Sequence, residues 1–169
     1  IGTETVGGGG AGKVYFFRPD QDTTWTLDET FTADYNIHSL AVYKGLLYAG
    51  TRTVLSGTPR IYVRATDGTW TSSLTVSPAS AGFSLTAGLT VFGDNLYALV
   101  YADGTVDESE QITIRKFDGT SWSTVWTLDE GGQASRTQPG IGMGLVIDEA
   151  LYFVIGAADA AATPNANTD

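Results

Sequence analysis

A run of acidic side chains is the sequence feature that comes closest to a metal site. Asp103, Asp107, Glu108 and Glu110 place four carboxylates within eight residues. Hard oxygen ligands of this kind suit Ca²⁺, although the spacing does not match the loop of an EF-hand. This segment is therefore a candidate calcium site, and the alternative is a solvated acidic loop.

Tryptophans form the second candidate site, because aromatic faces can serve as platforms for sugar rings. The candidate ligand-binding residues are Trp25, Trp70, Trp122 and Trp126. The first three each follow an Asp-containing turn, so they can equally be architectural, with Asp20, Asp67 and Asp118 capping backbone amides. Core positions recur in every unit of a repeat, whereas binding sites tend to break its symmetry. Recurrence thus favours architecture for three of them and leaves Trp126 as the surface candidate.

Catalysis would require a different constellation. A glycosidase needs two carboxylates flanking the bond, or a tyrosine nucleophile supported by arginines. Arg64 and Arg115 both precede an Asp turn by three residues, and we expect them to occupy equivalent, structural positions. The sequence therefore predicts no catalytic residue.

These residues recur because the chain contains a repeat. The dipeptide Leu-Tyr follows an apolar run and a tight turn at Leu47-Tyr48, Leu96-Tyr97 and Leu151-Tyr152, at intervals of about fifty residues. The Asp-containing turns with their tryptophans alternate with it. Two alternating landmarks, each flanked by β-branched and aromatic residues, predict a unit of four antiparallel strands.

The strands follow from these landmarks. The first whole unit is expected at residues 39–43, 46–54, 60–66 and 70–76, and the second at 89–92, 96–101, 111–117 and 122–128. A third and fourth strand open the chain (13–17 and 25–31), and a first and second strand close it (143–147 and 151–155). No segment has helical periodicity.

Four short antiparallel strands per unit are typical of a β-propeller blade. The expected fold is therefore an all-β propeller with three blade-equivalents, two of them whole and one divided into complementary halves. The turns Asp67-Gly-Thr-Trp70 and Asp118-Gly-Thr-Ser-Trp122 resemble a shortened form of the Asp-box of sialidase-like and other repeat propellers, lectin-like ones included. The resemblance covers nearly the whole chain and points to the superfamily without naming a family within it.

Three blades cannot close a ring, since propellers typically have at least four. Two arrangements remain open. Either two copies assemble head to tail into six blades, or the chain is a piece of a longer propeller. The match between the two halves slightly favours self-association.

One propeller region flanked by flexible ends is the expected organisation. Residues 1–12 form a Gly-rich segment and residues 157–169 a flexible tail, while residues 13–36, 37–80, 81–136 and 137–156 hold the opening half, the two whole blades and the closing half.

The amino-acid composition disfavours several classes of function. Nine Lys and Arg against nineteen Asp and Glu give a net charge of −10, which disfavours nucleic-acid binding. The chain has no cysteine, so no disulfide or thiolate site is expected. It also has no apolar run of membrane-spanning length. Turns rich in Thr, Ser, Gly and Asn are typical of extracellular or virion-surface proteins.

The function predicted is that of a non-catalytic module for assembly or surface recognition, in a virion, fibre or secreted adhesin, with glycan as the leading ligand class. A propeller lectin completed by oligomerisation and a fragment of a glycan-cleaving enzyme are the alternatives. No cofactor is expected apart from the candidate Ca²⁺.

Overall fold

The computed structural model describes residues 11–32, 36–53, 59–76, 84–102, 111–129, 140–141, 144–153 and 155–156. All regular elements in these residues are β-strands in antiparallel pairs, which confirms the predicted all-β class. The described part contains no helix that is long and apolar enough to span a bilayer. The two ends that the sequence predicts to be flexible lie outside it, apart from residues 11 and 12.

Two units each consist of four consecutive strands. The first unit contains β3 (Asn36–Tyr43), β4 (Leu46–Thr53), β5 (Arg60–Arg64) and β6 (Trp70–Thr75). The second unit contains β7 (Ser84–Phe92), β8 (Asn95–Ala102), β9 (Gln111–Phe117) and β10 (Trp122–Asp129). Within each unit, every strand pairs with the next one along the chain, as predicted. The end of β4 also pairs with β7, which joins both units into one eight-stranded sheet.

Two-stranded sheets flank the units, one on the opening side and two on the closing side. The opening hairpin pairs β1 (Gly12–Phe16) with β2 (Thr26–Phe31). The closing hairpin pairs β12 (Leu145–Ile147) with β13 (Ala150–Tyr152), and β11 (Gly140–Ile141) pairs with β14 (Ile155–Gly156). Two whole units and two half-units are therefore present, as the sequence predicts.

The hydrogen-bonding register makes the units comparable position by position. Leu47 lies opposite Arg64, and Leu96 lies opposite Phe117. Arg64 therefore takes the position of Phe117, and the expected equivalence of Arg64 with Arg115 is wrong. Arg64 stands three residues before Asp67, whereas Phe117 immediately precedes Asp118, so counting back from the aspartate gives the wrong strand position.

A bulge recurs in the fourth strand of each unit. The register with the third strand skips Asp28, Ser73 and Val125, and each of these residues lies three positions after a tryptophan of the repeat. A bulge leaves one residue unpaired and redirects its side chain. Each unit can thus direct one side chain from its fourth strand toward the unit that follows.

The main core lies between the two whole units. On one side Tyr43 and Tyr48 are buried, and on the other side Leu89, Leu96 and Phe117 are buried. The Phe117 ring lies 5.9 Å from the Tyr43 ring and 6.1 Å from the Tyr48 ring, between ring centroids. Aromatic and aliphatic side chains from facing sheets thus fill this interface.

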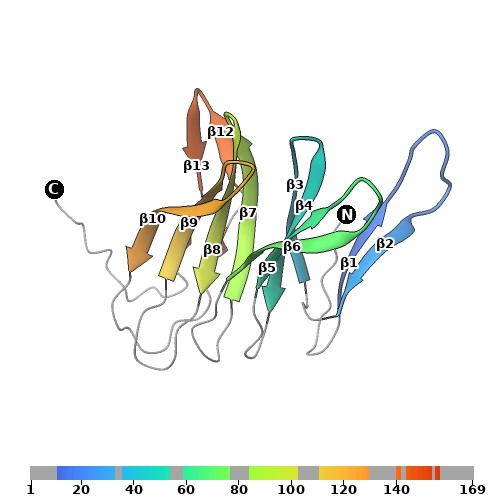
Figure 1. Cartoon of the computed structure of the whole chain (residues 1–169), viewed down its shortest axis with the longest axis horizontal. Helices are drawn as coiled ribbons and strands as arrows, with labels where there is room; N and C mark the ends of the chain where they lie inside the picture. The colour runs from blue at the N-terminus through green and yellow to red at the C-terminus, as the bar shows by residue number, and fades with distance from the viewer. Residues whose placement is uncertain are drawn as a thin grey trace.

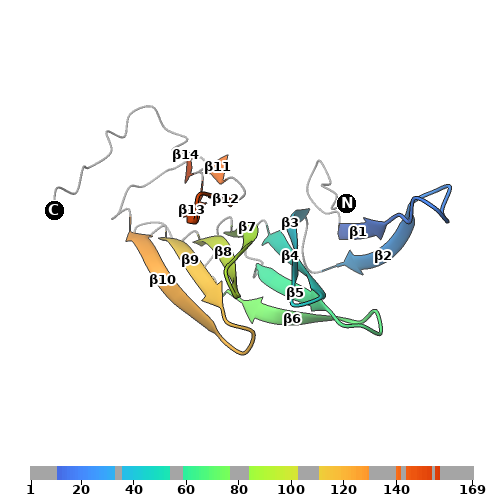
Figure 2. The same ribbon diagram turned by 90° about the horizontal axis from the view of Figure 1, so that it is seen from above.

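The units lie side by side in chain order, from β1–β2 through the first unit to the second (Figure 1). Seen from above, the first strands β3, β7 and β12 lie near one another, and the fourth strands β6 and β10 lie on the opposite side (Figure 2). In the described part of the chain, the sheets form an open arc and do not close a ring.

We predict that Leu96→Ala lowers the free energy of unfolding by about 3 kcal/mol, because truncating a fully buried leucine leaves a cavity. Leu27→Ala is the matched control: Leu27 is 48% exposed, and its truncation is expected to cost less than about 0.5 kcal/mol. Urea denaturation at a fixed protein concentration measures both values. Equal losses for the two variants would contradict this assignment of the core.

Candidate functional site

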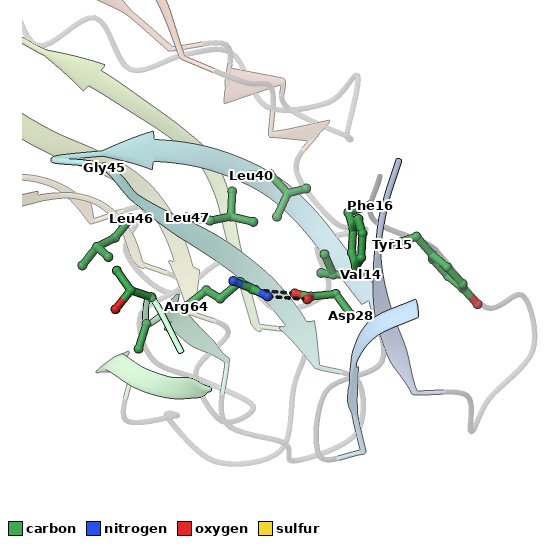
Figure 3. A pocket seen from close by; sticks show the side chains of 11 residues that line it. Val14, Tyr15, Phe16, Asp28, Leu40, Gly45, Leu46, Leu47 and Arg64 are labelled. Atoms are coloured by element: carbon green, nitrogen blue, oxygen red, sulfur yellow. Dashed lines mark hydrogen bonds and ion pairs between the residues drawn. The ribbon is translucent and has the colours of Figure 1, made fainter. Parts of the chain in front are cut away.

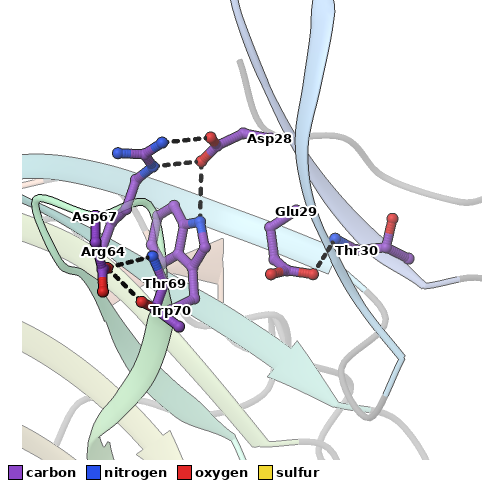
Figure 4. A network of polar contacts seen from close by, with 7 residues as sticks. All are labelled: Asp28, Glu29, Thr30, Arg64, Asp67, Thr69 and Trp70. Atoms are coloured by element: carbon purple, nitrogen blue, oxygen red, sulfur yellow. Dashed lines mark hydrogen bonds and ion pairs between the residues drawn. The ribbon is translucent and has the colours of Figure 1, made fainter.

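A polar network joins the opening hairpin to the first unit (Figure 4). The Arg64 guanidinium donates two hydrogen bonds to the Asp28 carboxylate, from Nε to Oδ2 at 2.7 Å and from Nη2 to Oδ1 at 2.8 Å. Trp70 Nε1 donates to the same Oδ2 at 2.9 Å. The Asp28 side chain is only 8% exposed, so both of its oxygens are held by side chains of the neighbouring unit.

Local backbone features place these three groups together. The β2 bulge carries Asp28, and the turn between β5 and β6 brings Trp70 opposite Arg64. Gly68 adopts a φ of +94° in this turn, a conformation that favours glycine. The Asp67 carboxylate fixes the turn by accepting hydrogen bonds from the Thr69 amide, at 2.9 Å, and the Thr69 hydroxyl.

Electrostatics keep the network ionised. Hydrogen bonding from Arg64 lowers the pKa of Asp28, and the bond from Trp70 adds to the effect, although burial opposes it. The hydrogen bond with Asp28 raises the pKa of Arg64. A carboxylate held in this way does not serve as a general acid near neutral pH. The network is therefore suited to fixing one sheet against the next.

The same contact recurs at the next interface with different residues. Trp122 Nε1 donates to Ser73 Oγ at 3.0 Å, just as Trp70 donates to Asp28. Phe117 replaces Arg64 and stacks on Trp122, with 5.0 Å between ring centroids. The interpretation of Trp70 and Trp122 as architectural residues accounts for both contacts. The third bulge residue, Val125, is 48% exposed.

A pocket of about 450 Å³ opens beside the Arg64–Asp28 pair. Leu40, Leu46 and Leu47 of the first unit line one part of it, and Val14 and Phe16 of the opening hairpin line another (Figure 3). Its wall is mostly apolar, with a planar cation held in place by a carboxylate. Such a combination can bind an apolar or aromatic group.

The structure does not gather the four candidate tryptophans into one site. Trp70 and Trp122 are half-buried between units. Trp25 is 51% exposed and lies 5.3 Å from Phe17 between ring centroids, and Trp126 is 42% exposed. They lie in or just before the fourth strands of three different units or half-units, so any sugar-binding role stays a prediction.

The acidic residues expected to cap turns or to bind calcium have different outcomes. Asp67 and Asp118 accept backbone amides of their turns, as expected, but in the first copy the carboxylate that does so belongs to Asp22, which accepts from Arg18 N at 2.8 Å. The candidate calcium ligands Asp103, Asp107, Glu108 and Glu110 lie outside the described residues. Within those residues, no group of three or more His, Asp or Glu side chains is placed to hold a metal ion.

Sequence reasoning missed Asp28 and the pocket. A signal for Asp28 existed, because a polar residue stands three positions after the tryptophan in the first two copies, as Asp28 and Ser73. The pocket carries no sequence signal, since it depends on which sheet faces which.

No family model, curated protein or solved structure matches this chain. Its function therefore has to be inferred from its own residues.

We predict that exchanging the two interfaces is tolerated. Asp28→Ser and Arg64→Phe should each lower the free energy of unfolding by about 2 kcal/mol, because each removes the two charge-assisted hydrogen bonds between Arg64 and Asp28. The double variant reproduces the Ser73–Phe117 pair and should lose at least about 1 kcal/mol less than the sum of the two single losses. Urea denaturation of the four proteins tests this, and additive losses would refute the equivalence of the interfaces.

Acid should remove the contribution of Asp28. Its folded-state pKa lies below that of the unfolded chain, so its stabilisation is present above the unfolded pKa and is lost as the pH falls through the folded one. We therefore expect the stability difference between the native sequence and the double variant to shrink from neutral pH to about pH 2. The double variant retains Asp118, so its titration cancels. Asp67 loses only the attraction of Arg64, the smallest of the causes that lower its pKa, and this small difference has the same sign as that of Asp28. A difference that does not change with pH would contradict the assignment.

Proposed function

We propose that this chain is a non-catalytic β-propeller module that acts through assembly and surface recognition. The observation that carries the proposal is the repeated contact between successive sheets, in which the tryptophan of one unit donates to the bulge residue of the unit before it. Because the same positions are in contact at both interfaces, each sheet is turned relative to the preceding sheet by a similar angle. Repeated rotation of four-stranded sheets is how blades surround an axis.

Strand positions agree with this geometry. In a propeller the first strand of each blade faces the central channel and the fourth lies at the rim. Here β3 lies beside β7, and β7 contacts β12, while β6 and β10 lie on the far side (Figure 2). Radial order within the units supports a propeller over a flat stack of sheets.

Exposed apolar residues favour assembly as the role. Val42 of the first unit is 65% exposed, and Leu145 and Tyr152 of the closing hairpin are 58% and 54% exposed. Leu145 and Tyr152 lie opposite each other in the β12–β13 pair, and a contiguous apolar patch marks a site of interaction. An extracellular or virion-surface location suits such a module and is part of the proposal.

Glycan recognition is the second candidate function. It rests on the exposed rings of Trp25 and Trp126, whose faces can stack on sugars. A glycan array probes it directly: binding that Trp126→Ala abolishes and Trp122→Phe retains would support a lectin role, and an array without binding would count against it.

Electron microscopy of the purified protein tests the proposed fold of the assembly. We expect ring-shaped particles with a central channel, since blades that face an axis leave one open. Particles without a channel, such as stacked sandwiches or fibrils, would contradict the propeller.

A further inference from the structure

We infer that the closing hairpin of one copy binds in the pocket beside the opening hairpin of a second copy, with Ile147 and Tyr152 filling that pocket. The inference rests on the proposed propeller and identifies its partner as the same chain. Both the binding residues and the pocket belong to the described part of the structure.

The interface between the two whole units supplies the template. Tyr43 and Tyr48 project from one face of the first unit and pack on Leu89, Leu96 and Phe117 of the second. Tyr43 Oη also donates to the carbonyl of Asp94 at 2.7 Å. Tyr43 on the first strand and Tyr48 on the second strand thus pack against the facing sheet of the next unit.

The pocket presents the receiving half of the same interface. Leu47 and Arg64 of the first unit occupy the register positions of Leu96 and Phe117. Leu40 precedes Val42 by two residues, as Leu89 precedes Val91, and these valines lie opposite Leu47 and Leu96. Whereas Leu96 is fully buried, Leu47 is only half-buried. The opening hairpin corresponds to a third and fourth strand, so it provides no counterpart of Tyr43 or Tyr48. Among the described residues, none therefore fills the receiving surface at this position.

The closing hairpin carries the projecting half. Leu145 lies opposite Tyr152 in the β12–β13 ladder, as Ala41 lies opposite Tyr48. By the same register Ile147 corresponds to Tyr43. These three residues are 58%, 54% and 47% exposed in the order Leu145, Tyr152, Ile147. An apolar face that matches the buried face of the first unit is thus left uncovered.

Strand pairing would support the contact. Among the described strands, only β2 pairs with β1. In both whole units the second strand pairs with the third, with leucine of the Leu-Tyr dipeptide opposite Arg64 or Phe117. The same register between copies sets Leu151 opposite Phe17 and Tyr152 opposite Phe16. Docking would therefore extend β1–β2 into a four-stranded sheet.

Arg64 suits the incoming aromatic ring. The Tyr48 ring lies against Phe117 at the internal interface, so the Tyr152 ring would meet Arg64, the equivalent residue. Asp28 fixes the plane of this guanidinium. A planar cation against an aromatic face is attracted by the ring quadrupole. The replacement of Phe117 by Arg64 on the receiving side is thus still compatible with an aromatic partner.

Two copies joined in this way close on themselves. Each contributes two whole units and one half of each shared unit, which gives six blades related by a twofold axis. An interface that uses different surfaces on the two copies forms a closed ring only if the rotation between the copies returns to the start. A ring of six blades falls within the range of known propellers.

Complementation between two variants tests the inference. Light scattering should give twice 17.8 kDa for the native chain. Tyr152→Asp damages only the projecting face and Leu47→Asp only the pocket, so each alone should be a monomer. Their mixture should form a one-to-one complex, because one undamaged hairpin and one undamaged pocket remain. Leu27→Asp is the control, since the equivalent Ser72 and Thr124 stay exposed in the whole units, and it should keep the native mass.

Replacing Tyr152 by p-benzoylphenylalanine guards against variants that fail to fold. Photolysis of a mixture of isotopically light and heavy chains should give light–heavy cross-links to Leu40, Leu47 or Arg64. Cross-links confined to one chain, a native mass for Tyr152→Asp, or a folded native monomer would each overturn the inference. A channelled ring that persists in Tyr152→Asp would overturn it while leaving the proposed propeller intact.

Discussion

A sheet with apolar side chains on both faces is stable only between two neighbours, and this constraint governs the whole chain. The first unit shows it most clearly, since Tyr43 and Tyr48 project from one face, and Leu40 and Leu47 from the other. Burying apolar area is the main source of folding free energy. Each unit therefore depends on the unit beside it, and we propose that a second copy covers the apolar faces that the described residues leave exposed.

The interaction that sets neighbouring sheets in place is small and repeated. A bulge in the fourth strand directs one side chain to the next unit, where an indole N–H donates to it. Asp28 and Ser73 serve this role with different chemistry, one in an ion pair and the other in a neutral hydrogen bond. Buried ion pairs are often replaceable by well-packed neutral groups at little net cost, so the two interfaces can share one geometry without sharing a sequence.

Much of this fold could be predicted from sequence because its signals are local. The Leu-Tyr dipeptides and the Asp turns mark strand ends, and the strands occur close to where they indicate. The equivalence of Arg64 with Phe117 could not be predicted, since the turn aspartate stands at a different distance from the end of the third strand in the two units. The pocket could not be predicted either, because it depends on which face of the first unit the opening hairpin leaves uncovered. The acidic segment and the sugar-binding role of Trp126 stay predictions.

Chemical labelling of the tyrosines at a series of protein concentrations tests most directly whether a second copy covers the closing hairpin. Tyr48 is buried within one chain and should resist labelling at every protein concentration. Tyr152 is 54% exposed and should be labelled in dilute solution and protected as the concentration rises. Labelling of Tyr152 to the same extent at all concentrations, in a protein that remains folded, would show that this face needs no partner and would contradict the account.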